Sequence, residues 1–196
     1  MRIVIEGPDG AGKSTLVQGL RKKLLGYHFT KEPSDYNEEL RIIREVLKQE
    51  MLPLNAQVKL FNLSRRLMSW ELEITNALYD RSVISSLIYQ GVMDDELPLV
   101  EEVNKEWLEK FNVDIIVILT RGKDNYISAH RGFNDIFDNA DMDYHKLLNH
   151  AYKNFDYLKY FPSSKVILMD LEQTPMTEEE VINYVYKQIM NHKGDN

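Results

Sequence analysis

The run EGPDGAGKST at residues 6–15 has glycines, a lysine and a hydroxyl group at a spacing suited to holding a triphosphate. It matches the pattern G-x-x-x-x-G-K-[ST], in which glycines let backbone amides surround a phosphate. A helix that begins at such a loop points its positive end at the same anion. We expect Lys13 to neutralise phosphate oxygens and Ser14 to ligate Mg²⁺. The predicted triphosphate-binding residues are Gly7, Asp9, Gly10, Ala11, Gly12, Lys13, Ser14 and Thr15.

A phosphate loop of this kind also needs a carboxylate near the metal, and two aspartates follow apolar runs. Asp80 ends the run ALYD, and Asp170 ends the run VILMD. Asp80 is followed directly by Arg81, whose guanidinium can hold a phosphate through two hydrogen bonds. The Asn-Lys pair at 104–105 lacks the Asp of the base-reading motif of GTPases. An Asp-Arg pair is also common as a surface ion pair, so this pattern alone leaves the class of P-loop protein open.

Two further segments carry side chains suited to a nucleoside. A helix after Arg81 sets Ser85 and Tyr89 four residues apart on one face, with Ser86 beside them. Upstream, Phe61 and Arg65 lie four residues apart in LFNLSRR, where a ring can stack on a base and an arginine can bond its carbonyls. Tyr89 and Phe61 fit the apolar core of a helix equally well. The local pattern therefore leaves both interpretations open.

Strands and helices alternate along the chain, which predicts a mostly parallel sheet covered by helices on both faces. The predicted strands are 2–6, 27–31, 77–80, 113–120 and 165–170. The predicted helices are 14–25, 37–49, 55–76, 82–91, 97–111 and 177–190. Ligands bind such sheets at the carboxyl ends of the strands, where the phosphate loop and the Asp80-Arg81 pair both fall. We therefore expect a three-layer α/β/α fold of the P-loop NTPase type with a central five-stranded parallel sheet.

Composition narrows the class of protein. The chain has 196 residues, enough for one domain with a buried core. It has no cysteine, and no apolar run approaches the roughly 18 residues of a membrane span. A net charge of −7 without a basic face argues against a nucleic-acid partner. We expect one domain over residues 1–196, a cytoplasmic location, a small anionic ligand, and neither a nucleic-acid nor a membrane partner.

Five ordered motifs resemble those of the thymidylate kinase family over nearly the whole chain. EGPDGAGKST is similar to E-G-x-D-G-x-G-K-[ST]-T, and KEPSDYNEELRIIREVL to the R-E-P segment and its following helix. LFNLSRR fits F-x-x-x-R, DRSVISSLIYQG fits D-R-[YFH]-x-x-S-x-x-A-Y-Q-G, and RGFNDIFD resembles the lid sequence R-G-x-x-D-R-x-E. The resemblance implies a homodimeric kinase that transfers the γ-phosphoryl group of ATP to dTMP with Mg²⁺. It also implies a helical lid at about 131–142.

The resemblance implies a role for each matching residue. Phe61 stacks on thymine, Arg65 bonds its carbonyl edge, and Tyr89 lies under C2′ and excludes ribonucleotides. The implied catalytic residues are Lys13, Asp9, Arg81 and Arg131. The implied substrate-binding residues are Asp9, Lys31, Phe61, Arg65, Arg81, Ser85, Ser86, Tyr89 and Gln90. The implied metal ligands are Ser14 and Asp80.

The chain departs from the family pattern in the lid and after Arg81. Ile136 replaces the lid arginine and Asp138 replaces the lid glutamate, so Arg131 is the main lid cation. The other departures are Ser82 and Ile88. Two alternatives therefore stay open. One is a deoxynucleoside kinase that uses Glu32 as a base on a 5′-hydroxyl, and the other is a nucleotide-binding regulatory protein without transferase activity.

Overall fold

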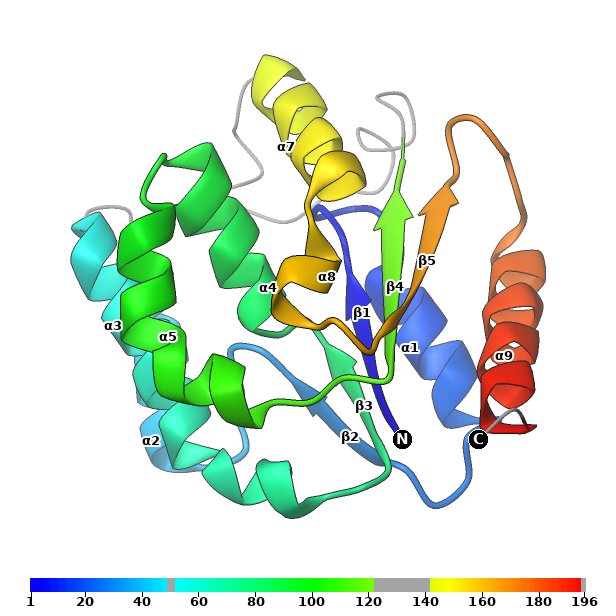
Figure 1. The fold of residues 1–196 in the computed structure, drawn as a ribbon, viewed down its shortest axis with the longest axis horizontal. Helices are drawn as coiled ribbons and strands as arrows, with labels where there is room; N and C mark the ends of the chain where they lie inside the picture. The colour runs from blue at the N-terminus through cyan, green and yellow to red at the C-terminus, as the bar shows by residue number, and fades with distance from the viewer. Residues whose placement is uncertain (49–51, 122–141, 195–196) are drawn as a thin grey trace.

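A sheet of five parallel strands forms the centre of the molecule (Figure 1). The computed structural model describes residues 1–48, 52–121 and 142–194. In sheet order the strands are β2 (His28–Lys31), β3 (Ala77–Asp80), β1 (Arg2–Glu6), β4 (Ile115–Thr120) and β5 (Lys165–Asp170). The predicted five-stranded parallel sheet is confirmed. Because all strands run the same way, their carboxyl ends meet at one edge, where Asp80 pairs with both Ile5 and Lys31.

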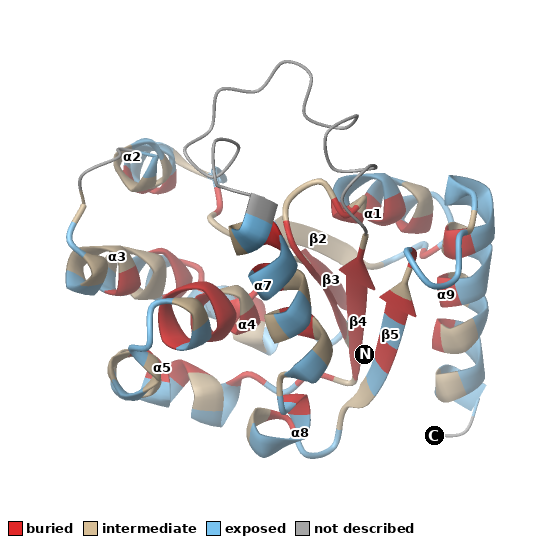
Figure 2. Ribbon diagram, turned by 90° about the horizontal axis from the view of Figure 1, so that it is seen from above, coloured by how far each residue is buried: buried red, intermediate tan, exposed pale blue. Residues whose placement is uncertain are grey.

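Helices cover both faces of this sheet, as Figures 1 and 2 show. One face carries α1 (Lys13–Arg21) and α9 (Glu178–Gly194). The other carries α4 (Val83–Ser86), α5 (Leu97–Lys110), α7 (Met142–Asn154) and α8 (Tyr157–Tyr160). The remaining described helices are α2 (Glu38–Leu47), α3 (Leu54–Leu67), the 3-10 helix η1 (Ser69–Glu73) and the π-helix η2 (Leu87–Met93). Within the described ranges no helix combines the length and apolar composition needed to cross a bilayer.

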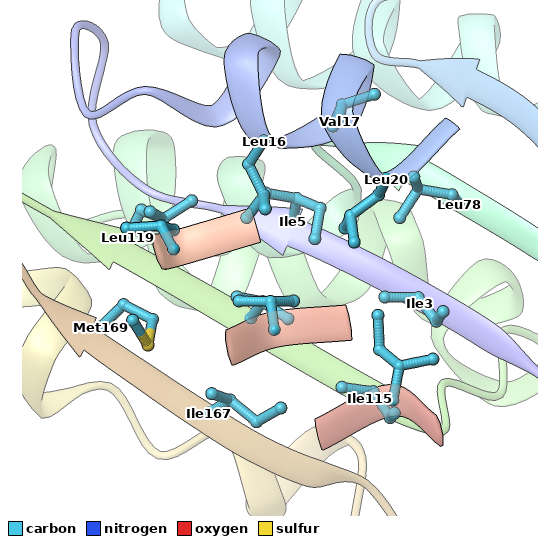
Figure 3. Close-up of a cluster of buried hydrophobic side chains, with 14 of the residues drawn as sticks. Ile3, Ile5, Leu16, Val17, Leu20, Leu78, Ile115, Leu119, Ile167 and Met169 are labelled. Atoms are coloured by element: carbon cyan, nitrogen blue, oxygen red, sulfur yellow. The ribbon is translucent and has the colours of Figure 1, made fainter. Parts of the chain in front are cut away.

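Alternation of side chains along the central strands explains why both faces are apolar. Ile3 and Ile5 of β1 face α1 and α9, whereas Val4 between them faces the opposite layer. Figure 3 shows Ile3 and Ile5 in one cluster with Leu16 and Leu20 of α1. Burial on both faces anchors β1 and α1 on either side of the phosphate loop, so the loop is attached to rigid elements at both ends.

Several element boundaries differ from the sequence predictions. The helix predicted to reach residue 76 ends at Leu67, because the chain tightens into η1 and buries Glu71 next to His28 of β2. The helix predicted over 82–91 divides into α4 and η2. The strand predicted from 113 begins at Ile115, and Asp114 there accepts a hydrogen bond from the Arg2 amide at 2.6 Å. No element was predicted over α7 or α8.

Candidate functional site

The loop between β1 and α1 has the backbone shape of a phosphate-binding loop. Gly7 and Gly12 have positive φ angles of 143° and 97°. At Gly7 a Cβ would lie 2.0 Å from the carbonyl oxygen of Leu119 on β4, so a side chain does not fit there. Lys13 is buried, and its ammonium donates to the carbonyl oxygen of Pro8 at 2.6 Å. The predicted order of strand, loop and helix is present, and α1 begins at Lys13.

Two oxygens at the start of α1 and the end of β3 form a candidate metal position. Ser14 Oγ donates to Asp80 Oδ2 at 3.3 Å. Mg²⁺ prefers such oxygen ligands and completes its shell with phosphates and water. No cluster of three or more His, Cys, Asp or Glu side chains in the described part of the chain could hold a metal by itself. The donor set therefore fits Mg²⁺ that is bound together with a triphosphate.

The alternative metal carboxylate, Asp170, is engaged elsewhere. It ends the edge strand β5, and its Oδ2 lies 2.6 Å from Nζ of Lys153. Strand β3, which carries Asp80, is adjacent to β1 and therefore to the phosphate loop. Strand order thus brings Asp80, which the family resemblance implies as a metal ligand, and not Asp170, next to the phosphate loop.

Arg81 lies between the phosphate loop and α4, and its φ angle of 70° is in the left-handed region. For a residue with a Cβ this conformation costs about 1–2 kcal/mol, so surrounding contacts must stabilise it. Its Nη2 forms an ion pair with Asp9, and its Nη1 donates to Ser85 Oγ at 3.0 Å. The Tyr89 hydroxyl donates to Asp9 Oδ2 at 3.2 Å. The structure therefore brings three other predicted site residues, Asp9, Ser85 and Tyr89, together around the Arg81 guanidinium.

The charges of this group shift one another's ionisation. Burial alone raises the pKa of Asp9, but Arg81 and Lys13 nearby hold it well below its usual range. Burial, with repulsion from Arg81, lowers the pKa of Lys13 to about 8. The nearby carboxylates do not fully offset these effects on Lys13, so a phosphate in the loop would stabilise its charged form.

A cavity of about 220 Å³ opens beside Arg81. It is lined by Asp9, Glu32, Pro33, Arg44, Phe61, Arg65, Arg81, Ser85, Ser86, Tyr89 and Gln90. All the predicted substrate-binding residues except Lys31 are among them. We call this space the nucleoside cavity. Its walls come from the phosphate loop, the β2–α2 connection, α2, α3, the end of β3, α4 and η2.

Arg65 is firmly anchored at the wall of the nucleoside cavity. Its Nε donates to Glu32 Oε2 at 2.8 Å, and its Nη2 donates to Ser86 Oγ at 2.7 Å. Its Nη1 donates to Asn104 Oδ1 of α5 at 2.9 Å. The guanidinium carbon lies 5.9 Å from the centroid of the Phe61 ring. Because three partners orient the guanidinium, a ring lying on Phe61 would meet a preorganised donor.

Lys31 lies outside the nucleoside cavity. Its ammonium is 2.7 Å from Asp35, and it lines a neighbouring cavity of about 450 Å³ on the α1 side of the sheet. Arg44 of α2 lines the nucleoside cavity instead and donates to the carbonyl oxygen of Pro33 at 3.2 Å. Successive side chains of a strand point to opposite faces, so the register of β2 decides where Lys31 points. Sequence reasoning missed Arg44 because periodicity does not tell which charged position of a helix faces a cavity.

Three other residues near the site were also missed. Arg121 follows β4, and its guanidinium would lie 3.5 Å from a Cβ placed on Gly12. Its Nε is buried without a hydrogen-bond partner in the described part of the chain. Glu6 and Tyr152 form part of the contacts around Arg81. The sequence held a signal for only one of these three residues: Glu6 is a carboxylate at the end of a predicted buried apolar strand.

The predicted lid cation, Arg131, lies outside the described residues. The same holds for residues 131–141 of the predicted lid, including Ile136 and Asp138. Their assignment stays a prediction from the sequence.

The parallel sheet, the phosphate loop at its carboxyl edge and the adjoining nucleoside cavity define a P-loop nucleotide-binding protein with room for a second ligand. A family model described as Thymidylate kinase matches residues 5–157. The thymidylate kinase of Mycoplasmopsis agalactiae is 27% identical, with 95% of each chain covered. That of Mycoplasma genitalium is 30% identical, covering 75% of this chain and 81% of the relative. The chain belongs to the thymidylate kinase family.

A solved structure supports the same fold. The thymidylate kinase of Candida albicans superposes with a TM-score of 0.78 at 20% identity. The match covers 100% of this chain and 93% of the Candida chain. At this level of identity the similarity concerns the fold, and the side chains of the site must be judged from this chain's own geometry.

Proposed function

We propose that this protein transfers the γ-phosphoryl group of ATP to dTMP and so forms dTDP. Membership of the thymidylate kinase family supports this reaction. The observation that carries it is the position of Arg81, whose guanidinium contacts Asp9 of the phosphate loop and also lines the nucleoside cavity. A monophosphate held by Arg81 therefore lies next to a triphosphate held by the loop.

The donor half of the site consists of the phosphate loop and the end of β3. Lys13 neutralises β- and γ-phosphate oxygens, and the amides of the loop surround them. Ser14 and Asp80 would hold Mg²⁺, which would neutralise the charge that develops on the phosphates. Their mutual hydrogen bond of 3.3 Å supports this assignment because both oxygens already face one position.

The acceptor half of the site is the nucleoside cavity. Phe61 offers an apolar face to the base, and Arg65 offers N–H groups to a carbonyl edge. Ser86 accepts a hydrogen bond from Arg65, which leaves its own hydroxyl proton for a ligand. The Gln90 carboxamide oxygen is buried and has no partner in the described chain, so it suits the N–H of an imide. Thymine presents carbonyl oxygens and an imide N–H, whereas cytosine lacks that N–H.

Tyr89 and Asp9 border the sugar position. The Tyr89 ring is buried, its hydroxyl is bonded to Asp9, and its centroid lies 5.4 Å from the Arg81 guanidinium carbon. A ring fixed by such contacts leaves little room for a 2′-hydroxyl, so the site favours deoxyribose. Asp9 is held in its ionised form and accepts a hydrogen bond from the 3′-hydroxyl.

Catalysis here depends on positioning and charge neutralisation. The acceptor phosphate is already an anion, so its attack needs no strong general base. Lys13 and Arg81 flank the transferred group from the donor and the acceptor side. Gly10 and Ala11 add no cation to the loop, so we propose that Arg131 of the predicted lid, at about 131–142, supplies further positive charge.

We also propose that the protein is a homodimer formed through α2 and α3. Leu63 and Leu67 lie four residues apart on one face of α3 and are 45% and 43% exposed. Ile42 of α2, which packs on α3, is 58% exposed. We take these exposed apolar side chains on two packed helices as the interaction surface. A second copy of the chain would cover them symmetrically.

The test of the proposed reaction is an assay of ATP-Mg²⁺ with dTMP, dUMP, dCMP, dGMP, dAMP and thymidine. We expect dTMP to be the best acceptor, followed by dUMP, because both carry the imide edge. Phosphorylation of thymidine without phosphorylation of dTMP would show a deoxynucleoside kinase instead. A protein that phosphorylates none of these acceptors, and whose melting temperature no deoxynucleotide shifts, would favour the regulatory alternative.

A further inference from the structure

The carboxylate of Glu6 is fully buried beside the site, and no step proposed above uses it. Its Oε1 accepts hydrogen bonds from the Ser82 amide at 2.8 Å and from Ser82 Oγ at 2.9 Å. Its Oε2 accepts from Ser85 Oγ at 2.7 Å and from the Tyr152 hydroxyl at 3.4 Å. The donors come from the start of α4, from α4 itself and from α7, and all of them converge on the last residue of β1.

Two of these four bonds come from Ser82, the residue after Arg81, and one of them holds its backbone amide. The Arg81 amide donates to the carbonyl oxygen of Ile5 at 3.0 Å, and the next amide, that of Ser82, donates to Glu6. The amides of Arg81 and Ser82 are thus held by Ile5 and Glu6, two successive residues of β1. These two bonds fix the backbone on either side of Arg81, which has a left-handed conformation with a φ of 70°. Without the Glu6 carboxylate the hydrogen bond to the Ser82 amide is lost, and the Arg81 backbone can relax toward a more common conformation.

The other two bonds determine how the guanidinium is held. A hydroxyl has one proton, and when Ser85 and Tyr152 donate theirs to Glu6, their lone pairs are left for Arg81. Arg81 Nη1 accordingly donates to Ser85 Oγ at 3.0 Å and to the Tyr152 hydroxyl at 3.4 Å. The carboxylate thus sets the direction of both hydroxyls, and the hydroxyls set the plane of the guanidinium.

We propose that Glu6 is a positioning residue for Arg81, acting through Ser82, Ser85 and Tyr152. Glu6 does not line the nucleoside cavity, so its effect on the acceptor passes through Arg81. The inference rests on the proposed function, in which Arg81 holds the acceptor phosphate. A carboxylate accepts at both oxygens and donates at neither, whereas the amide of glutamine brings two N–H groups toward these donors.

The first experiment compares the wild-type protein with Glu6→Gln in steady-state kinetics. We expect KM for dTMP to rise about tenfold, with a smaller change in kcat, because an interaction with the bound acceptor is weakened. KM for ATP should stay within about twofold, since Lys13 and the loop amides are unchanged. An equal rise in both KM values would overturn the proposal, because it would indicate general damage to the fold.

The second experiment places Glu6→Gln in an Arg81→Ala background. If Glu6 acts through Arg81, the double variant should bind and use dTMP much as Arg81→Ala does, so the two effects are not additive. Full additivity would mean that Glu6 works independently of Arg81 and would overturn the inference. Dissociation constants for dTMP, measured by calorimetry, provide the comparison even where turnover is slow.

Tyr152→Phe removes the hydroxyl that connects Glu6 to Arg81 and leaves Glu6 in place. It should raise KM for dTMP several-fold and leave KM for ATP unchanged. Tyr157→Phe is the matched control, because the Tyr157 hydroxyl is also buried, donates to the Tyr152 carbonyl oxygen at 2.7 Å and does not contact Arg81. Equal effects of the two tyrosine variants on dTMP would contradict the proposed link. If Glu6→Gln does not fold, these two tyrosine variants still test whether Glu6 positions Arg81 through Tyr152.

Failure of this inference and failure of the proposed function give different results. If the wild-type protein neither binds nor phosphorylates dTMP, the proposed function is wrong. The positioning role of Glu6 is then wrong as well, because it requires Arg81 to bind the acceptor phosphate. If the wild-type protein and Arg81→Ala behave as expected but Glu6→Gln matches the wild type, only the positioning role is wrong.

Discussion

Glu32 and Arg65 form an ion pair in the wall of the nucleoside cavity, with Arg65 Nε 2.8 Å from Glu32 Oε2. Arg65 is almost completely buried, and its other two nitrogens are bonded to Ser86 and Asn104. The carboxylate that a deoxynucleoside kinase would use as its general base thus orients Arg65, the arginine that we propose binds the nucleobase. This arrangement favours a monophosphate as acceptor.

We expect Glu32→Gln to raise KM for dTMP several-fold and to lower kcat by less than about tenfold, because the amide still holds Arg65 through one oxygen. Steady-state kinetics with dTMP and with thymidine provide the measurement. A loss of a thousandfold or more in kcat, with thymidine as the better acceptor in the wild type, would instead identify Glu32 as a general base.

Lys13→Ala should lower kcat by about a hundredfold to a thousandfold, because we propose that its buried ammonium neutralises the transferred phosphate. The fold should persist, since the strands and helices on either side of the loop are held by apolar packing. Lys110→Ala is the matched control: its ammonium pairs with Glu106 on the surface of α5, far along the chain from the loop. Turnover of Lys13→Ala close to that of the wild type would refute the role of the loop.

Arg44→Ala and Lys31→Ala separate the cation that lines the nucleoside cavity from the one predicted by the sequence. Arg44→Ala should raise KM for dTMP about tenfold, as expected for loss of a charged hydrogen-bond donor. Lys31→Ala should change KM for dTMP less than about twofold, because Lys31 pairs with Asp35 outside this cavity. The reverse order of effects would show that Lys31 reaches the acceptor phosphate after all.

Asp9→Asn should make the stability of the protein less sensitive to acid. The pKa of Asp9 is depressed in the folded state, so its ionised form stabilises the fold above the unfolded pKa of about 3.9. This contribution is lost as the pH falls from about 4 toward the folded pKa. The difference in free energy of unfolding between wild type and variant, from urea titrations, should therefore shrink below pH 4. A difference that stays constant from pH 7 to pH 3 would contradict the pairing of Asp9 with Arg81 and Lys13.

The double substitution Leu63→Glu and Leu67→Glu should halve the molar mass in solution, because like charges would face one another across the proposed α2–α3 interface. Light scattering coupled to gel filtration measures this directly. Leu158→Glu is the matched control, since Leu158 is 50% exposed on α8 and lies outside α2 and α3. A wild-type protein that is already monomeric, or a control that dissociates equally, would contradict the dimer.

Much of the fold was predictable because its signals are local. The glycine spacing of the phosphate loop and the apolar runs that become β1, β3, β4 and β5 are properties of short segments, and the strands alternate with helices. Boundaries were less predictable. The end of α3 at Leu67 depends on η1 folding back so that Glu71 meets His28, a contact between residues 43 apart.

By itself, the sequence determined the phosphate loop, the parallel sheet and the motifs that place the chain in its family, because these follow from residue types at fixed spacings. Only the tertiary structure decided that Arg44 and not Lys31 lines the nucleoside cavity, and that Glu6 supports Arg81. Each depends on the face to which a side chain points or on a partner as distant as Tyr152, 146 residues from Glu6. Such contacts arise from the packing of separate elements, and no local spacing encodes them.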